Sequence, residues 1–171
     1  MDTTAFIKKF NSHDAHPFFQ FVKYGIAGAA ATAVQLVVFY VLASLVIHAL
    51  TADDAFVIGL AKVGLTVHTP DITDAVRSNR TAINNLIAFL FSNFVAYLLN
   101  IVWVFRRGRH GFWKELGLFY LGSAGSFLIG TGVAWLLVRF AGMQTTYAIL
   151  INIVISVIIN YLFRKFLVFK G

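Results

Sequence analysis

Four polar residues recur at every fourth position near the C-terminus of this 171-residue chain, inside an otherwise apolar stretch. They are Asn152, Ser156, Asn160 and Arg164. Residues four apart lie on one slowly drifting face of a helix, so this stripe would extend for about 18 Å along it. A guanidinium group can bind a phosphate, and amides further along the same face can hydrogen-bond to the hydroxyl groups of a headgroup attached to that phosphate. The stripe therefore predicts a binding face for a phosphorylated, hydroxyl-rich ligand.

Polar side chains of the same kinds occur in two other apolar stretches. Asn93 and Asn100 lie in one of them, and Gln35 is the strongly polar side chain in the middle of another. Two more cations are available, Lys23 before Gln35 and Lys165 directly after the stripe. Amide groups facing hydrocarbon would lack hydrogen bonds, so we expect these side chains to point inward. Two interpretations stay open: they line a path for a ligand headgroup, or they only join helices by hydrogen bonds.

The elements that must position these residues are four long apolar stretches. They cover residues 21–50, 82–105, 116–139 and 147–163, with almost no charged side chains inside them. A helix needs about 20 apolar residues to cross the core of a bilayer. The sequence therefore predicts an all-α, polytopic membrane protein with four transmembrane helices.

The charged residues predict how these helices are oriented. Ten of the fourteen lysines and arginines lie beside the start of the first stretch, between the second and third, or after the fourth. With four spans these three regions share one side of the membrane, and the positive-inside rule makes that side cytoplasmic. We therefore expect both termini in the cytoplasm.

Two segments stand apart from the apolar stretches of the predicted four-helix domain, residues 21–171. Residues 1–20 form a polar lead, which we place in the cytoplasm. Residues 51–81 form a long extracytoplasmic insertion, and its part 55–67 is apolar but too short to span a bilayer. Because this part also carries Lys62, we expect an interfacial or re-entrant helix there.

The second and fourth apolar stretches resemble each other. A shift of 64 residues places Ser92 on Ser156 and Tyr97 on Tyr161. The same shift aligns the Val-Phe pairs at 104–105 and 168–169. This internal repeat predicts two helical hairpins of like orientation, a parallel repeat.

Several classes of function are disfavoured by what the sequence lacks. There is no cysteine, and the five histidines share no metal-ligand spacing, so we expect no metal site. No Asp or Glu lies within an apolar stretch, which argues against a proton-coupled exporter. No catalytic constellation is recognisable, so we expect neither an enzyme nor a cofactor. The net charge of +7 is concentrated on one predicted side of the membrane and does not indicate a nucleic-acid partner.

Three motifs resemble those of the GtrA-like family, which is similar to the membrane region of polyprenol-phosphate mannose synthases. One is the run Lys-Tyr-Gly-Ile-Ala-Gly at residues 23–28. The other two end the second and fourth stretches, at residues 96–105 and 160–169, each with a Tyr-Leu pair and a final Val-Phe. The resemblance covers residues 21–50 and 82–169.

The resemblance implies work on polyprenyl-phosphate-linked sugars in the glycosylation of cell-envelope polysaccharides. Members of the family are thought to move such lipids across the bilayer, or to support the glycosyltransferases that use them. We therefore expect a flippase for a polyprenyl-phosphate sugar in the inner membrane of a bacterial or archaeal cell. The alternative is a non-transporting scaffold that anchors a glycosyltransferase.

The flippase hypothesis assigns roles to the polar residues. Lys23, Arg164 and Lys165 would bind the lipid phosphate. The headgroup path would consist of Gln35, Asn93, Asn100, Asn152, Ser156 and Asn160. Four helices barely enclose such a path, so we also expect a homo-oligomer.

Overall fold

The computed structural model describes residues 17–104 and 111–163, and most of these residues lie in helices. The elements are α2 (Pro17–Leu45), α3 (Ala55–Lys62), α4 (Asp74–Leu99), the π-helical segment η1 (Asn100–Val104), α5 (Phe112–Ala141) and α6 (Thr145–Phe163). These residues contain no strand, which confirms the all-α prediction. Most of the predicted lead 1–20 lies outside them.

Among the described residues, three helices are long and apolar enough to cross a membrane, as a polytopic protein requires. They are Phe18–Leu45, Asp74–Val104 and Phe112–Ala141. The fourth long helix, α6, contains the shorter apolar segment Thr145–Ile159. This segment is not among the three candidate spans, although α6 as a whole, with 19 residues, would cover about 28 Å at 1.5 Å per residue. The fourth span therefore stays a prediction.

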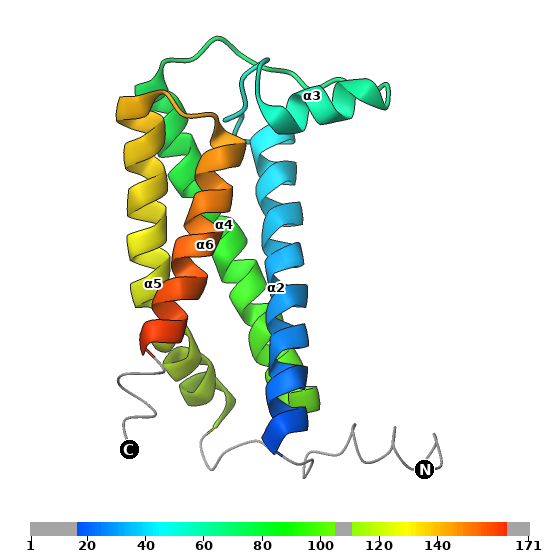
Figure 1. The fold of residues 1–171 in the computed structure, drawn as a ribbon, viewed down its shortest axis with the longest axis vertical. Coiled ribbons are helices and arrows are strands. Elements are labelled where there is room, and N and C mark those ends of the chain that lie inside the picture. The colour runs from blue at the N-terminus through cyan, green and yellow to red at the C-terminus, as the bar shows by residue number, and fades with distance from the viewer. Residues whose placement is uncertain (1–16, 105–110, 164–171) are drawn as a thin grey trace.

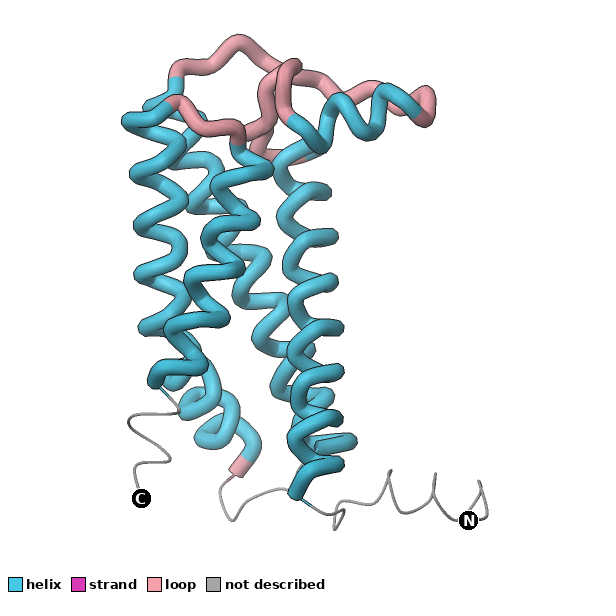
Figure 2. The backbone as a smooth tube through the Cα atoms, in the orientation of Figure 1, coloured by secondary structure: helices cyan, strands magenta, loops and turns pink. Residues whose placement is uncertain are grey.

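The long helices α2, α4, α5 and α6 run side by side and alternate in direction (Figure 1). α2 packs on α4, α4 also packs on α5, and α5 packs on α6. We call the end where α2 begins and α6 ends the η1 end, and the other the α3 end. The loops after α2, α3 and α5 gather at the α3 end (Figure 2). α4 thus joins the two predicted hairpins, whose relation as a parallel repeat stays a prediction.

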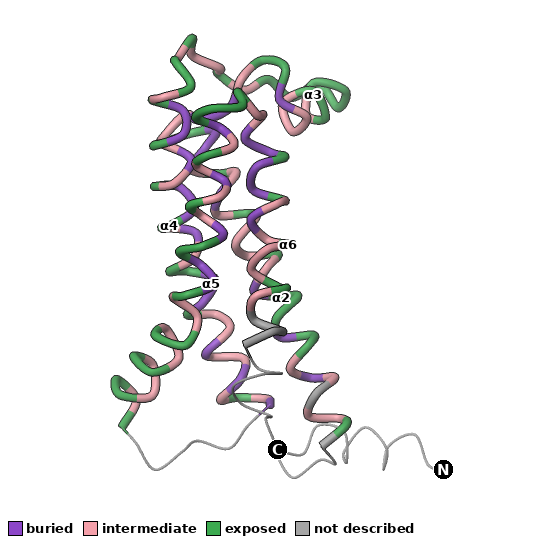
Figure 3. Tube along the Cα trace, turned by 60° about the vertical axis from the view of Figure 1, so that its left-hand side comes forward, coloured by how far each residue is buried: buried purple, intermediate pink, exposed green. Residues whose placement is uncertain are grey.

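In α4 the buried face is polar and the exposed face is apolar, which is the reverse of a helix in a water-soluble protein. Its buried residues are mostly polar and include Arg77, Ser78, Thr81, Asn84, Asn85, Ser92 and Asn93. Its apolar residues Ile83 and Phe91 are 48% and 58% exposed. Figure 3 shows such exposed and buried positions alternating along the helices. In a bilayer the apolar side chains can face lipid while the polar ones find partners inside the bundle.

α5 and α6 approach each other closely at Gly130. A Cβ atom on Gly130 would lie 2.1 Å from Asn152 Oδ1 and 2.7 Å from Ser156 Oγ. Only a residue without a side chain fits there, as small residues do at helix crossings in membranes. The chain reverses between the two helices at Gly142, whose φ of +61° is in the left-handed region that favours glycine.

The insertion contains the short helix α3, which ends at Lys62 rather than at residue 67, and its last residues, 74–81, already belong to α4. It begins after Asp54, whose side chain accepts a hydrogen bond from the backbone nitrogen of Phe56. No residue of α3 is fully buried, and the helix lies across the end of α2 (Figure 1). This position agrees with the interfacial alternative and not with a helix that re-enters the bundle.

Candidate functional site

A chain of hydrogen bonds crosses the middle of the bundle. Gln35 Nε2 on α2 donates to Asn85 Oδ1 on α4 at 3.0 Å. Asn85 Nδ2 in turn donates to Thr131 Oγ1 on α5 at 2.6 Å. The prediction that Gln35 points inward is therefore correct, and its partners join three helices. Sequence reasoning missed Asn85, although Asn85 lies on the same helix face as Ser92, seven positions further on.

Asn152 and Ser156 form a second polar group, packed against α5. Asn152 is 1% exposed, and its Oδ1 accepts a long hydrogen bond of 3.4 Å from Ser156 Oγ. Ser156 Oγ also lies 3.4 Å from the backbone oxygen of Ser126. Within the described part of the chain, no hydrogen bond links this pair to Gln35. The predicted headgroup residues thus form separate groups rather than one continuous row.

Lys23 is fully buried at the η1 end of the bundle. Its Nζ donates to the backbone oxygen of Trp103 at 2.9 Å and lies 6.0 Å from the centre of that indole ring. Trp103 belongs to η1, the π-helical segment that continues α4 at its C-terminal end. A cation there stabilises the helix end. Lys23, which we predicted to bind a phosphate, therefore already has a hydrogen-bond partner within the protein.

Two of the residues predicted to line the headgroup path, one in α4 and one in η1, carry buried polar atoms that lack a hydrogen-bond partner among the described residues. They are Asn93 Nδ2 and Asn100 Oδ1, on side chains of residues that are 7% and 6% exposed. The other amide atom of Asn100, Nδ2, donates to the backbone oxygen of Ala96 at 2.7 Å. Nearby on α5, Glu115 Oε1 is also buried without a partner, whereas Glu115 Oε2 accepts from Tyr97. Each such atom costs about 1–3 kcal/mol, so these positions call for a ligand or solvent group.

Three predicted site residues lie outside what the structure describes. Arg164 and Lys165 follow the last described residue, and the side chain of Asn160 is not described. The geometry at the η1 end therefore rests on Lys23, Asn93 and Asn100.

The family of the chain follows from residues 73–169, which match the GtrA/DPMS transmembrane domain. The chain belongs to this family. The match confirms the resemblance seen in the sequence, and it indicates a membrane protein of a glycosylation pathway. It covers α4, η1, α5 and α6, whereas α2 and α3 precede it. Neither a curated protein nor a solved structure matches the chain significantly.

At the α3 end, this member of the GtrA/DPMS family buries charges that sequence reasoning did not single out. Asp54 is fully buried and accepts hydrogen bonds from the backbone nitrogen of Thr146 at 3.0 Å and from the Thr146 hydroxyl. It also accepts from the backbone nitrogen of Phe56 at 3.0 Å. One carboxylate therefore caps the starts of both α3 and α6. The sequence offered one signal for this role, because an Asp directly before an apolar run is typical of a residue that caps the start of a helix.

Two arginines of α4 also donate hydrogen bonds to backbone oxygens at this end of the bundle. Arg77 is 3% exposed and donates to Asp74 at 2.6 Å and to the backbone oxygen of Gly142 at 3.1 Å. Arg80 donates to the backbone oxygen of His48 at 3.0 Å. These bonds tie α4 to the ends of α2 and α5, so the α3 end is cross-linked by polar contacts.

The polar residues of the predicted path do not line the groove that the structure describes between α2 and α3. That groove is formed mostly by apolar side chains, from Leu36 to Leu45 on α2 and from Phe56 to Val67. The apolar groove and the polar side chains of the predicted path therefore lie in different parts of the protein.

Proposed function

We propose that this protein binds a polyprenyl-phosphate-linked sugar and moves it across the membrane. The observation that carries the proposal is a set of unpartnered amide atoms on the inward face of a membrane helix, Asn84 Oδ1, Asn93 Nδ2 and Asn100 Oδ1. They include a donor and two acceptors at different heights, so the helix face offers both kinds of hydrogen-bonding group to a headgroup that carries hydroxyls. Such atoms are rarely left unpaired unless something else binds them.

The physical role of these amides is to lower the barrier for the headgroup. An unpaired hydroxyl in hydrocarbon costs several kcal/mol, so a sugar cannot cross a bilayer without partners. Amides along α4 and α6 would exchange hydrogen bonds with it in turn. The separate polar groups, Asn93 with Asn100 and Asn152 with Ser156, would then be successive stations rather than one continuous row.

The phosphate would be bound at the η1 end, where we expect the cytoplasm. Lys23 lies there, and Arg164 and Lys165 follow α6, which ends at the same end of the bundle (Figure 1). In this proposal a phosphate replaces the carbonyl of Trp103 as the partner of Lys23. We expect no catalytic step, and we expect the protein to work as a homo-oligomer in the inner membrane.

The test is flipping of a defined short-chain polyprenyl-phosphate sugar by the purified protein in proteoliposomes. We expect the double variant Arg164→Ala, Lys165→Ala to lose at least about tenfold in rate, because charge-assisted bonds to the phosphate disappear. The matched control is Arg139→Ala, a cation at the other end of the bundle, which should flip like the wild type. Equal rates for wild type and double variant would refute the assigned role.

A second candidate is a scaffold that anchors a glycosyltransferase without transporting lipid. The chain of hydrogen bonds from Gln35 through Asn85 to Thr131 favours it, because these side chains already satisfy one another. This candidate predicts co-purification with a polyprenyl-phosphate glycosyltransferase and no flipping by the isolated protein.

A further inference from the structure

Two histidine side chains from separate parts of the chain meet at the α3 end of the bundle. His48 follows α2, and His68 lies in the segment 63–73 between α3 and α4, which we call the strap. Their ring centroids are 5.2 Å apart and their planes are inclined by 86°, so the edge of one ring meets the face of the other. This arrangement is favourable between neutral aromatic rings. The ring contact therefore joins the strap to the end of α2.

His48 belongs to a part of the chain that is held firmly in place. Three consecutive backbone oxygens, at residues 47–49, accept hydrogen bonds from other helices. Asn84 and Arg80 of α4 donate to the first two, at 2.9 Å and 3.0 Å, and the hydroxyl of Thr145 at the start of α6 donates to the third. The position of His48 is thus set by α4 and α6.

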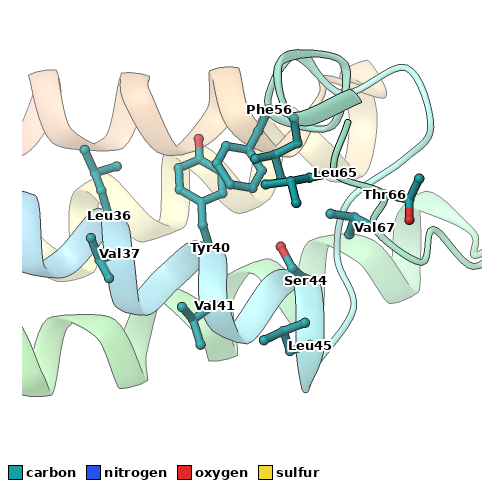
Figure 4. Close-up of a pocket in the computed structure, with 11 residues that line it drawn as sticks. Leu36, Val37, Tyr40, Val41, Ser44, Leu45, Phe56, Leu65, Thr66 and Val67 are labelled. Atoms are coloured by element: carbon teal, nitrogen blue, oxygen red, sulfur yellow. The ribbon is translucent and has the colours of Figure 1, made fainter. Parts of the chain in front are cut away.

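The strap, in contrast, has few contacts of its own. Within the described part of the chain, residues 66–72 take part in no hydrogen bond, and no residue of the strap is fully buried. Val67 packs against the apolar cluster at the end of α2. Residues 65–67 lie beside the last turns of α2 and form one side of the apolar groove there (Figure 4). A segment with so few contacts opens at low cost, so the strap is the part that can move.

Protons change the contact between the two rings. Histidine is the side chain that gains a proton between about pH 5 and 8. His68 is exposed and His48 is half-buried, so water reaches the pair. One proton leaves a cation beside a neutral ring, which is tolerated, whereas a second proton places two positive charges side by side. Water screens their repulsion, but mainly the apolar packing of Val67 opposes it.

The surrounding charges do not neutralise a doubly protonated pair. In the described ranges the one ion pair joins Arg77 to Asp74, so neither histidine is paired with a carboxylate. Arg80 adds a positive charge beside the backbone of His48, and α6 and the second half of α2 contain no charged residue. The other charged side chains at this end bind elsewhere or form no described ion pair; they are Asp53, Asp54, Lys62, Asp71 and Arg139.

We propose that His48 and His68 form an acid-sensitive latch, which holds the strap against the end of α2 and releases it when both rings are protonated. The released state binds one proton more than the closed state, so the equilibrium constant for opening rises as the pH falls, by at most about tenfold per pH unit. Opening withdraws residues 65–67 from the side of the groove. The latch lies at the end that we expect outside the cytoplasm, and it goes beyond the proposed transport of lipid, on which it does not depend.

The experiment measures the mobility of the strap in the full-length protein in nanodiscs. A nitroxide label is attached at Thr66→Cys, an exposed position in a chain that has no cysteine of its own. We expect the ratio of mobile to immobile label in the electron paramagnetic resonance spectrum to rise at least about tenfold between about pH 7.5 and about pH 5.5. The matched label at Leu136→Cys, at a half-exposed position of α5, should have the same mobility at both pH values.

Substitutions of the two histidines identify the groups that respond. His48→Phe and His68→Phe each keep an aromatic ring in the contact but remove the proton, so the strap label should stay immobile at the lower pH. The control is His110→Gln, which lies outside the described residues, in the basic link that the sequence places on the opposite side of the membrane. This variant should respond to acid like the wild type.

Three outcomes would overturn the proposal. One is equal mobility of the strap label at both pH values in the wild type. Another is an acid response that persists in both phenylalanine variants, because a carboxylate such as Asp54 would then cause the release. The third is a mobile label at both pH values in these variants, because a neutral pair of rings should hold the strap.

Discussion

Replacing Asp54 by alanine should loosen two helices at once. Its carboxylate is fully buried and accepts hydrogen bonds from the backbone nitrogen atoms of Phe56 and Thr146, each at 3.0 Å. These nitrogens belong to the first turns of α3 and α6, where backbone N–H groups have no partner within the helix. The Thr146 hydroxyl loses its acceptor as well.

The size of the effect follows from these bonds. Loss of an N-cap side chain typically costs about 1 kcal/mol, and a buried donor left unpaired costs about 1–3 kcal/mol. For two helix starts we expect Asp54→Ala to lower the free energy of unfolding by roughly 2–4 kcal/mol. The control is Asp53→Ala, because Asp53 is exposed and its contact with Gln144 is a long 3.4 Å. That change should cost under about 0.5 kcal/mol.

Reversible unfolding in detergent mixtures would measure both variants, and hydrogen exchange would locate the loss. We expect faster exchange at the starts of α3 and α6 and no change at the start of α5. If Asp54→Ala and Asp53→Ala have equal stabilities, the double cap is not a stabilising element.

Three further predictions concern the interior of the bundle. Gly130→Ala should destabilise the protein by about 1–3 kcal/mol, since a Cβ would overlap Asn152, whereas Gly125→Ala, with open space around it, should leave the unfolding midpoint unchanged or slightly higher, because alanine favours a helix. A double-mutant cycle with Gln35→Leu and Asn85→Leu should give a coupling energy near 0.6 kcal/mol, the average for hydrogen bonds in membranes; a value of zero would mean that this bond contributes nothing. Lys23→Met should slow flipping and also destabilise the end of α4, and Lys23→Arg, which keeps the cation, should restore both; a Lys23→Met variant that flips like the wild type would contradict a direct role in binding the phosphate.

Much of the candidate site could be predicted because it depends on local periodicity. Apolar stretches interrupted by amides at helical spacing require those amides to face inward in a bilayer, and Asn93, Asn100 and Asn152 are indeed buried. Gln35 meets another amide, as one of the two interpretations required. The same rule extended toward the start of α4 would have found Asn85.

The contacts at the α3 end could not be predicted in this way. Asp54 and Thr146 are 92 positions apart, and Arg77 reaches the backbone of Gly142 across 65 positions. In the sequence these charges stood in a polar link, where charged residues are expected in water. Their burial depends on how that link folds back over the ends of the helices.

The sequence by itself determined that the chain is helical, that most of it belongs in a bilayer and that its amides point inward, because these properties depend on composition and on a helical period of a few residues. Only the tertiary structure decided which polar groups meet, which stay unpaired and where apolar space opens beside α3. Those outcomes depend on where helices far apart in the chain cross, and no local pattern of residues specifies a crossing point.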